Sequence, residues 1–297
     1  MARPALSATR AIDILNFIAN QPGHEFTLSE LVQRLEVNIA SCHAILNTLT
    51  ESGYLVRHPT HKTYSLGPAL VATGQAALER HPAIGIAREE AAKLSAENNL
   101  DAMVTARMGK DMVGLARYGR YRSTAPSMGV GQHVPLIPPL GALFMAWSSN
   151  DKIEQWLKKL PHKTTKAERA RYDELLSVIR REGYAVYLET ELPIQLGEAV
   201  REVSFSTSSP SDRERLTTLI DKLGIEDHYL LYPESGRRYP VRMLSAPIFS
   251  PHGEVSYVIY LTGFGDSLGI EEIQGYARKL VATCRSVTMQ SNGKWMN

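Results

Sequence analysis

Three polar side chains recur at short spacing in one stretch of the chain, namely Ser41, His43 and Asn47. Hydroxyl, imidazole and amide groups donate and accept hydrogen bonds in patterns that match the edges of DNA bases, and an asparagine amide suits adenine. The stretch from Ile39 to Glu51 that carries them is expected to form a helix. Residue types and spacing together therefore predict a helical surface that reads base edges.

Two short helices joined by a tight turn must position these side chains. Thr27, with Glu30 three residues later, is typical of a capping box at the start of a helix. Residues 36–38 form the turn, and Asn38 is suited to cap the helix that follows it. Some combination of four side chains is expected to form the buried side of that second helix: Ala40, Ala44, Ile45 and Leu49.

Further elements complete a recognisable module around this helix pair. A preceding helix is expected from Ser7 to Asn20, and Pro22 with Gly23 ends it. Two β-prone runs at 54–57 and 63–66 flank a polar tip at 58–62. The order predicts a winged helix-turn-helix, a module that places the second helix of the motif in the major groove of DNA.

The charge of this region does not by itself indicate nucleic acid. The whole chain carries a net charge of +2, and residues 1–66 hold five basic and five acidic side chains. No lysine or arginine lies between Ile39 and Ser52, so this helix offers no arginine for bidentate contact with guanine. Phosphate contacts are therefore expected from basic side chains that flank the helix, Arg3 among them.

The candidate DNA-contacting residues come from the helix, its cap, the preceding helix and the wing. Cys42 is expected to be a small groove-facing or half-buried residue, because no basic side chain nearby would stabilise a reactive thiolate. His58 is expected to touch phosphate or water at the wing tip. The full set is Arg10, Asn38, Ser41, Cys42, His43, Asn47, Arg57, His58 and Lys62.

The rest of the chain predicts a linker and a mixed α and β domain. Helices are expected at 69–79, 84–98, 166–182 and 270–289. Strands are expected at 102–107, 112–118, 184–187, 242–249 and 255–262. The economical arrangement is a central antiparallel sheet covered by helices.

Composition narrows the class of protein further. Two cysteines far apart, no long apolar run and no secretory leader predict a cytoplasmic protein without disulfides or membrane contact. His58 and His61 lack accompanying ligands at metal-site spacing, so no metal or cofactor is expected. With no nucleophile elbow or phosphate-binding loop, we expect no catalytic residues and no enzymatic activity.

Several segments resemble the IclR-type transcriptional regulators. Arg10-Ala11-Ile12, Ser52-Gly53-Tyr54-Leu55 and Tyr64-Ser65-Leu66-Gly67 carry the likeness in the N-terminal part, and Gly183-Tyr184-Ala185 and Ser245-Ala246-Pro247-Ile248-Phe249 carry it in the C-terminal part. The resemblance implies an α+β fold with a winged helix-turn-helix domain (1–67), linker and dimerisation helices (68–99) and a GAF-like α/β effector-binding domain (100–297). An insertion is expected at 192–240, and whether it forms a lid, a partner surface or a decorated edge stays open.

The resemblance also implies a pocket for a small organic effector. Its lining is mostly hydrophobic, which favours a larger apolar or aromatic ligand with a few polar handles. The residues that carry over are Leu140, Gly141, Val241, Met243, Tyr260 and Thr262.

The function expected from all this is a ligand-responsive regulator of a catabolic or metabolic operon. Its partners would be double-stranded operator DNA, a small-molecule effector and copies of itself in a homodimer or homotetramer. Two alternatives stay open: a protein–protein adaptor that keeps the winged helix without binding DNA, and a small-molecule enzyme built on the α/β domain.

Overall fold

The structure is a computed structural model. It describes residues 5–19, 21, 23–120, 128–189, 195, 199, 214–215, 218–220, 222 and 225–296. Arg3 and most of the expected insertion lie outside the described residues. No helix in the described part of the chain combines the length and apolarity needed to cross a membrane.

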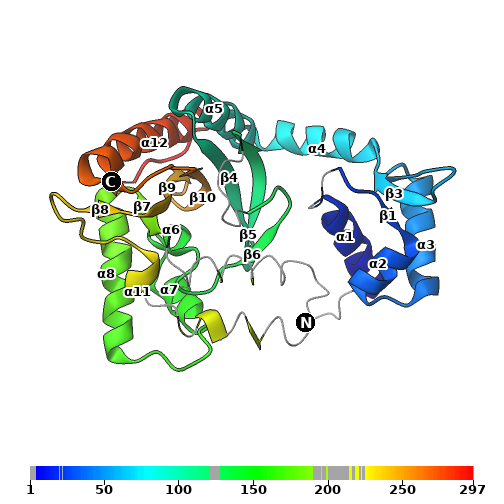
Figure 1. Cartoon of the computed structure of the whole chain (residues 1–297), viewed down its shortest axis with the longest axis horizontal. Helices are drawn as coiled ribbons and strands as arrows, with labels where there is room; N and C mark the ends of the chain where they lie inside the picture. The colour runs from blue at the N-terminus through cyan, green and yellow to red at the C-terminus, as the bar shows by residue number, and fades with distance from the viewer. Residues whose placement is uncertain are drawn as a thin grey trace.

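The N-terminal part is the predicted winged helix-turn-helix. Its elements, in chain order, are α1 (Leu6–Ala19), β1 (Phe26–Thr27), α2 (Leu28–Leu35), α3 (Ile39–Glu51), β2 (Leu55–Arg57) and β3 (Thr63–Leu66). The three strands pair in the order β1-β3-β2. Strand β1 was not predicted, because two residues are too few to show a pattern. Figure 1 shows this unit at the end of the molecule remote from the C-terminal sheet.

Both predicted helix caps of the motif are confirmed. The Thr27 hydroxyl accepts a hydrogen bond from the Glu30 amide, and the Glu30 carboxylate accepts one from the Thr27 amide at 2.7 Å. The Asn38 side-chain oxygen accepts hydrogen bonds from the amides of Ala40 and Ser41 at 2.9 and 3.3 Å. These caps satisfy amides that have no partner within a helix, and they fix where α2 and α3 begin.

The buried side of α3 differs from the expectation. Cys42 and Leu46 are fully buried, whereas Ala40 and Ala44 are exposed. Ile45 and Leu49 are partly buried against the same core, as expected. Alanine and cysteine have similar size and weak polarity, so the sequence pattern did not show which of them faces inward.

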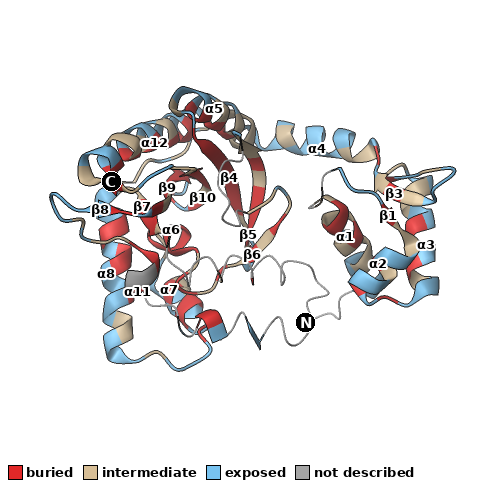
Figure 2. Ribbon diagram, viewed as in Figure 1, coloured by how far each residue is buried: buried red, intermediate tan, exposed pale blue. Residues whose placement is uncertain are grey.

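Helix α4 (Ala69–Arg80) joins this unit to the rest of the chain. The Ala69 amide donates to the Gly53 carbonyl at 3.1 Å, which fastens the start of the helix to the winged-helix unit. Gly67 is required there, because a Cβ atom at this position would lie 2.2 Å from the Gly53 carbonyl oxygen. Helix α4 has no buried residue, and most of its length is exposed (Figure 2).

The C-terminal part is built on one six-stranded antiparallel sheet. Its order is β6-β5-β4-β10-β9-β7. The strands are β4 (Asp101–Met108), β5 (Asp111–Tyr118), β6 (His133–Pro135), β7 (Ala185–Leu188), β9 (Val241–Phe249) and β10 (Val255–Thr262). A separate small pair consists of β8 (Arg238–Tyr239) and β11 (Leu268–Gly269).

Helices cover both faces of this sheet, as predicted. One face carries α5 (Pro82–Asn98) and α12 (Ile270–Gln290), which share a core cluster with the strands. The opposite face carries α6 (Ala142–Met145), α7 (Asn150–Leu157), α8 (Lys166–Glu182) and α11 (Ile225–His228). Helix α7 was not predicted. Because α5 packs on the sheet, α4 is the described segment that spans the distance between the two parts of the molecule (Figure 1).

A β-bulge interrupts the pairing of β7 with β9. Tyr187 pairs with Met243 but the next residue, Leu188, pairs with Val241, so Arg242 is an extra residue on β9. A bulge of one residue reverses which face the following side chains occupy. Val241 and Met243 therefore point to opposite faces of the sheet, and each joins a different core cluster.

Replacing the cap residue Asn38 tests how the second helix of the motif is held. Asn38→Ala removes the acceptor for two backbone amides, so we expect the free energy of unfolding of the winged-helix unit to fall by about 1 kcal/mol. Urea unfolding of the full chain, followed by circular dichroism, measures this. Asn38→Asp keeps the acceptor oxygen and should remain near wild type; an equal loss in both variants would contradict the assignment.

Candidate DNA interface and effector site

The exposed face of α3 presents His43 and Asn47 to solvent. One helical turn separates them, and the Asn47 side-chain nitrogen lies 3.4 Å from Nδ1 of His43. An amide nitrogen only donates, so Nδ1 is the acceptor, and this contact requires the His43 tautomer that carries its hydrogen on Nε2. The pair thus presents an outward donor on His43 and an amide oxygen with a second N–H on Asn47.

The other predicted residues of this helix have different positions. Ser41 is partly buried, and Asn38 is exposed but engaged as the cap. Cys42 is fully buried in the winged-helix core, and burial raises the pKa of its thiol. The expectation that Cys42 faces the groove is therefore wrong: its side chain fills the space between α3 and the rest of the core.

The flanking basic residues lie on two elements, α1 and the wing. Arg10 is partly exposed on α1, and the guanidinium of the exposed Arg57 lies over the ring of Tyr64, 5.6 Å from its centre. At the wing tip, Nδ1 of His58 accepts hydrogen bonds from the amides of Thr60 and His61 at 3.2 and 3.1 Å. Lys62 is exposed and has a positive φ of 58°.

All the predicted effector residues except Val241 lie at the sheet face that carries α6 and α8. Thr262 pairs with Met243, and Tyr260 lies on the same side of β10 two residues earlier. Leu140 packs against the core cluster of this face. Gly141 is buried beside Leu140, and its φ of 77° lies in the left-handed region that favours glycine. A Cβ atom there would lie 2.1 Å from Cδ1 of Leu136, so the Leu136 side chain would have to shift.

Val241 does not join them. The bulge at Arg242 turns the Val241 side chain to the α5 and α12 face, where it is buried with Leu244. Its predicted place in the effector site is therefore wrong, and the reason is the reversed alternation along β9.

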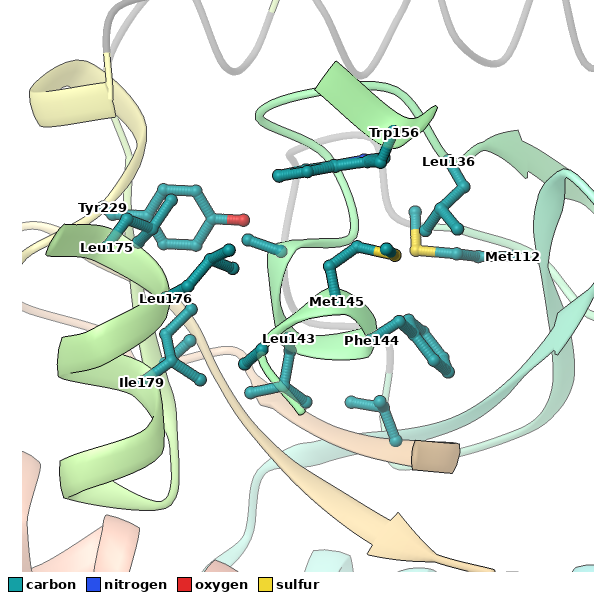
Figure 3. Close-up of a cluster of buried hydrophobic side chains, with 14 of the residues drawn as sticks. Met112, Leu136, Leu143, Phe144, Met145, Trp156, Leu175, Leu176, Ile179 and Tyr229 are labelled. Carbon is teal, nitrogen blue, oxygen red and sulfur yellow. The ribbon is translucent and has the colours of Figure 1, made fainter. Parts of the chain in front are cut away.

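A buried group of polar side chains surrounds Tyr260 that the sequence did not indicate. The Ser245 hydroxyl donates to the Tyr187 oxygen at 3.2 Å, and the ring centre of Tyr187 lies 6.2 Å from that of Tyr260 and 4.8 Å from that of Tyr229. The Tyr229 hydroxyl donates to the Pro139 carbonyl at 2.8 Å. Figure 3 shows it pointing from beside α8 toward the segment before α6. Tyr187 and Ser245 lay in predicted strands. Tyr229 lies in a segment whose position in the fold the sequence did not indicate.

His228 completes this group and keeps it uncharged. Its ring contacts Tyr187 and Tyr229, and neither ring nitrogen has a hydrogen-bond partner among the described residues. Burial lowers the pKa of His228 to about 3, with a further contribution from the positive charge of Arg242. Burial also raises the pKa of the hydroxyls of Tyr187, Tyr229 and Tyr260. At neutral pH the group therefore offers neutral donors and acceptors.

The described residues hold no cluster of three or more His, Cys, Asp or Glu side chains that could bind a metal ion. His58 and His61 contact each other through their rings, with centres 4.5 Å apart.

The architecture is similar to that of known proteins. The model of the IclR helix-turn-helix domain matches residues 7–59, which run from α1 into the wing. The DNA-binding transcriptional repressor YiaJ of Escherichia coli (strain K12) is 25% identical over 275 residues, which are 88% of this chain and 79% of that protein. Residues 7–59 therefore form a helix-turn-helix domain of the IclR type, and the chain is similar over most of its length to a DNA-binding transcriptional repressor.

Solved structures show that the chain shares its fold with IclR-type proteins over nearly its whole length. An IclR transcriptional regulator from Alicyclobacillus acidocaldarius has a TM-score of 0.67 at 19% identity and covers 98% of this chain and 100% of its own. An IclR homolog from Microbacterium hydrocarbonoxydans, in complex with 4-hydroxybenzoate, has a TM-score of 0.61 at 13% identity over 96% and 99%. The likeness supports the α+β fold with an N-terminal helix-turn-helix domain and a C-terminal α/β domain.

The buried neutral His228 predicts how stability depends on pH. Its pKa is lower in the folded protein than the ordinary 6.5, so below pH 6.5 the unfolded chain binds a proton that the folded chain excludes. Stability attributable to His228 is complete above this pH and falls as the pH decreases toward 3. Between pH 7 and pH 5 the loss should be about 2 kcal/mol.

His228→Gln removes this titration while keeping an uncharged polar side chain. We expect the variant to lose less stability than wild type between pH 7 and pH 5, measured by urea unfolding at each pH. His252→Gln changes an exposed histidine and serves as control. Identical pH dependence in wild type and His228→Gln would show that His228 is not buried neutral.

Proposed function

We propose that the protein is an IclR-type regulator that binds operator DNA with α3 in the major groove and the wing beside the backbone. The exposed polar pair on α3 supports this placement, because His43 and Asn47 are the groups on that face able to distinguish bases. Arg10, Arg57, His58 and Lys62 lie on α1 and the wing, where we assign them to phosphate. Asn38 and Ser41 lie at the start of α3, the end that contacts bases in such motifs.

We further propose that two or four copies act together. Each winged helix holds equal numbers of basic and acidic residues, so one copy alone has little electrostatic affinity for DNA. A dimer places two α3 helices on successive major grooves and doubles the phosphate contacts. The regulator would then control a catabolic or metabolic operon from the cytoplasm.

We assign the effector site to the sheet face around Tyr260. The single observation that carries this is the buried group of Tyr187, Tyr229, Tyr260, Ser245 and His228. The two ring nitrogens of His228 are buried without a hydrogen-bond partner among the described residues. Leaving such atoms unpaired costs roughly 1–3 kcal/mol each, and a bound ligand with a matching group would recover that cost. Apolar neighbours such as Met243 and Leu140 favour an apolar or aromatic body for the ligand. The related protein bound to 4-hydroxybenzoate agrees with this chemistry.

DNA binding is tested with duplexes selected by the full-length protein from a randomised library. We expect affinity to fall linearly with salt on logarithmic axes, because cations leave the DNA as phosphates are neutralised. Lys62→Ala should lower affinity for all selected duplexes alike and reduce the salt slope by about one. Lys163→Ala, an exposed lysine of the α/β domain, is the matched control. An absence of any salt-dependent binding would instead favour the adaptor alternative.

The effector site is tested by thermal shift with phenol, benzoate and 4-hydroxybenzoate. A ligand that binds only the folded protein raises the melting temperature. Tyr260→Phe and Met243→Ala should each reduce the shift produced by an active compound. Val241→Ala, on the opposite face of the same sheet, should lower the melting temperature but preserve the ligand-induced shift. Equal shifts in wild type, Tyr260→Phe and Met243→Ala would contradict the assignment, and recovery of a converted compound would favour an enzyme.

A further inference from the structure

His43 and Asn47 are joined in a way that assigns each of them one part in recognition. The amide nitrogen of Asn47 lies 3.4 Å from Nδ1 of His43, one helical turn away on the exposed side of α3. This contact uses one N–H of Asn47 and fixes which end of the amide faces His43. The amide oxygen and the remaining N–H then face outward together. An asparagine without such a contact rotates, and its amide has this orientation only part of the time.

Their neighbours leave room for these short side chains to reach the bases. Ala40 and Ala44 are exposed on the same side of α3, and each extends only a methyl group from the backbone. The hydroxyl of Thr48 donates to the Ala44 carbonyl at 3.1 Å, so it is not aimed outward as a competing donor. No charged side chain lies on α3 before Glu51 at its last position. Close approach of the helix to the groove floor is therefore unobstructed.

We propose that Asn47 reads an adenine and that His43 acts both as its positioning residue and as a reader of a neighbouring guanine. The outward oxygen of Asn47 accepts from the adenine N6 amino group while its free N–H donates to N7. The outward Nε2–H of His43 donates to guanine, which presents two acceptors, N7 and O6, in the major groove. This inference rests on the proposed placement of α3 in the major groove.

Two conservative substitutions separate the parts of His43. In His43→Asn the side-chain oxygen takes the place of Nδ1, so the variant still holds Asn47 but lacks the outward donor. In His43→Gln the side-chain amide takes the place of Nε2, so the outward donor is kept and the contact that orients Asn47 is lost. Because both variants are polar, uncharged and surface-exposed, neither should change the stability of the helix appreciably.

The test uses one duplex selected by the wild-type protein, with single bases replaced by analogues. At the adenine read by Asn47, 7-deazaadenine lacks the N7 acceptor and purine lacks the amino group; each should lower wild-type affinity about 10-fold. Asn47→Ala should bind the natural and both modified duplexes equally. At the guanine read by His43, 7-deazaguanine should also weaken wild-type binding.

The His43 variants decide the proposal. His43→Asn should keep the adenine discrimination and lose the response to 7-deazaguanine, and His43→Gln should show the reverse. Loss of both responses in both variants, or of neither, would overturn the division of roles. If the full-length protein selects no duplex and shows no salt-dependent binding, the failure lies in the placement of α3 and not in the contact between the two side chains.

Discussion

Burial of both faces of the six-stranded sheet is the constraint on which the rest of the structure depends. A strand between two cores must send alternate side chains into each of them, so any shift of one residue exchanges the two sets. The bulge at Arg242 makes such a shift on β9. It delivers Met243 to the face with Tyr187 and Tyr260, and Val241 to the face under α12. The extra residue Arg242, where β9 pairs with β7, thus determines which side chains line the candidate effector site.

The candidate DNA-reading face of α3 carries no charged side chain before Glu51, and the buried group around Tyr260 is polar but uncharged. Each site depends on neutral hydrogen bonds where a fixed charge would be the simpler solution. Neutral donors and acceptors are directional, and they lose little free energy on leaving water only when every partner is present. Under the proposed function both sites would gain selectivity from geometry, since a wrong base or a wrong ligand would leave a group without its partner.

Local structure could be predicted from the sequence where one residue type has one local use. Thr27 with Glu30, and Asn38 before Ile39, fixed helix starts because caps act through adjacent backbone amides. The sequence did not show which side chains are buried, or where a strand is interrupted, when these depend on contacts between segments far apart in the chain. Cys42, and not Ala40, lies on the buried side of α3 because of how α3 packs against α1 and α2. The bulge at Arg242 arises where β9 pairs with β7. His228 and Tyr229 join Tyr187 through tertiary folding, and no local pattern announces that.

The exposure of α4 has a mechanical consequence. A helix of 12 residues with no buried side chain is held by its own backbone hydrogen bonds, and such a helix is marginal in water. Its first residue is fastened to the winged-helix unit, so bending or fraying must occur farther along, toward His81. Among the described residues, α4 is therefore the weakest part of the connection between the winged-helix unit and the sheet. Under the proposed function, a surface that packs along α4 would stiffen it, and that stiffness would set how strongly a change at the sheet alters the position of α3.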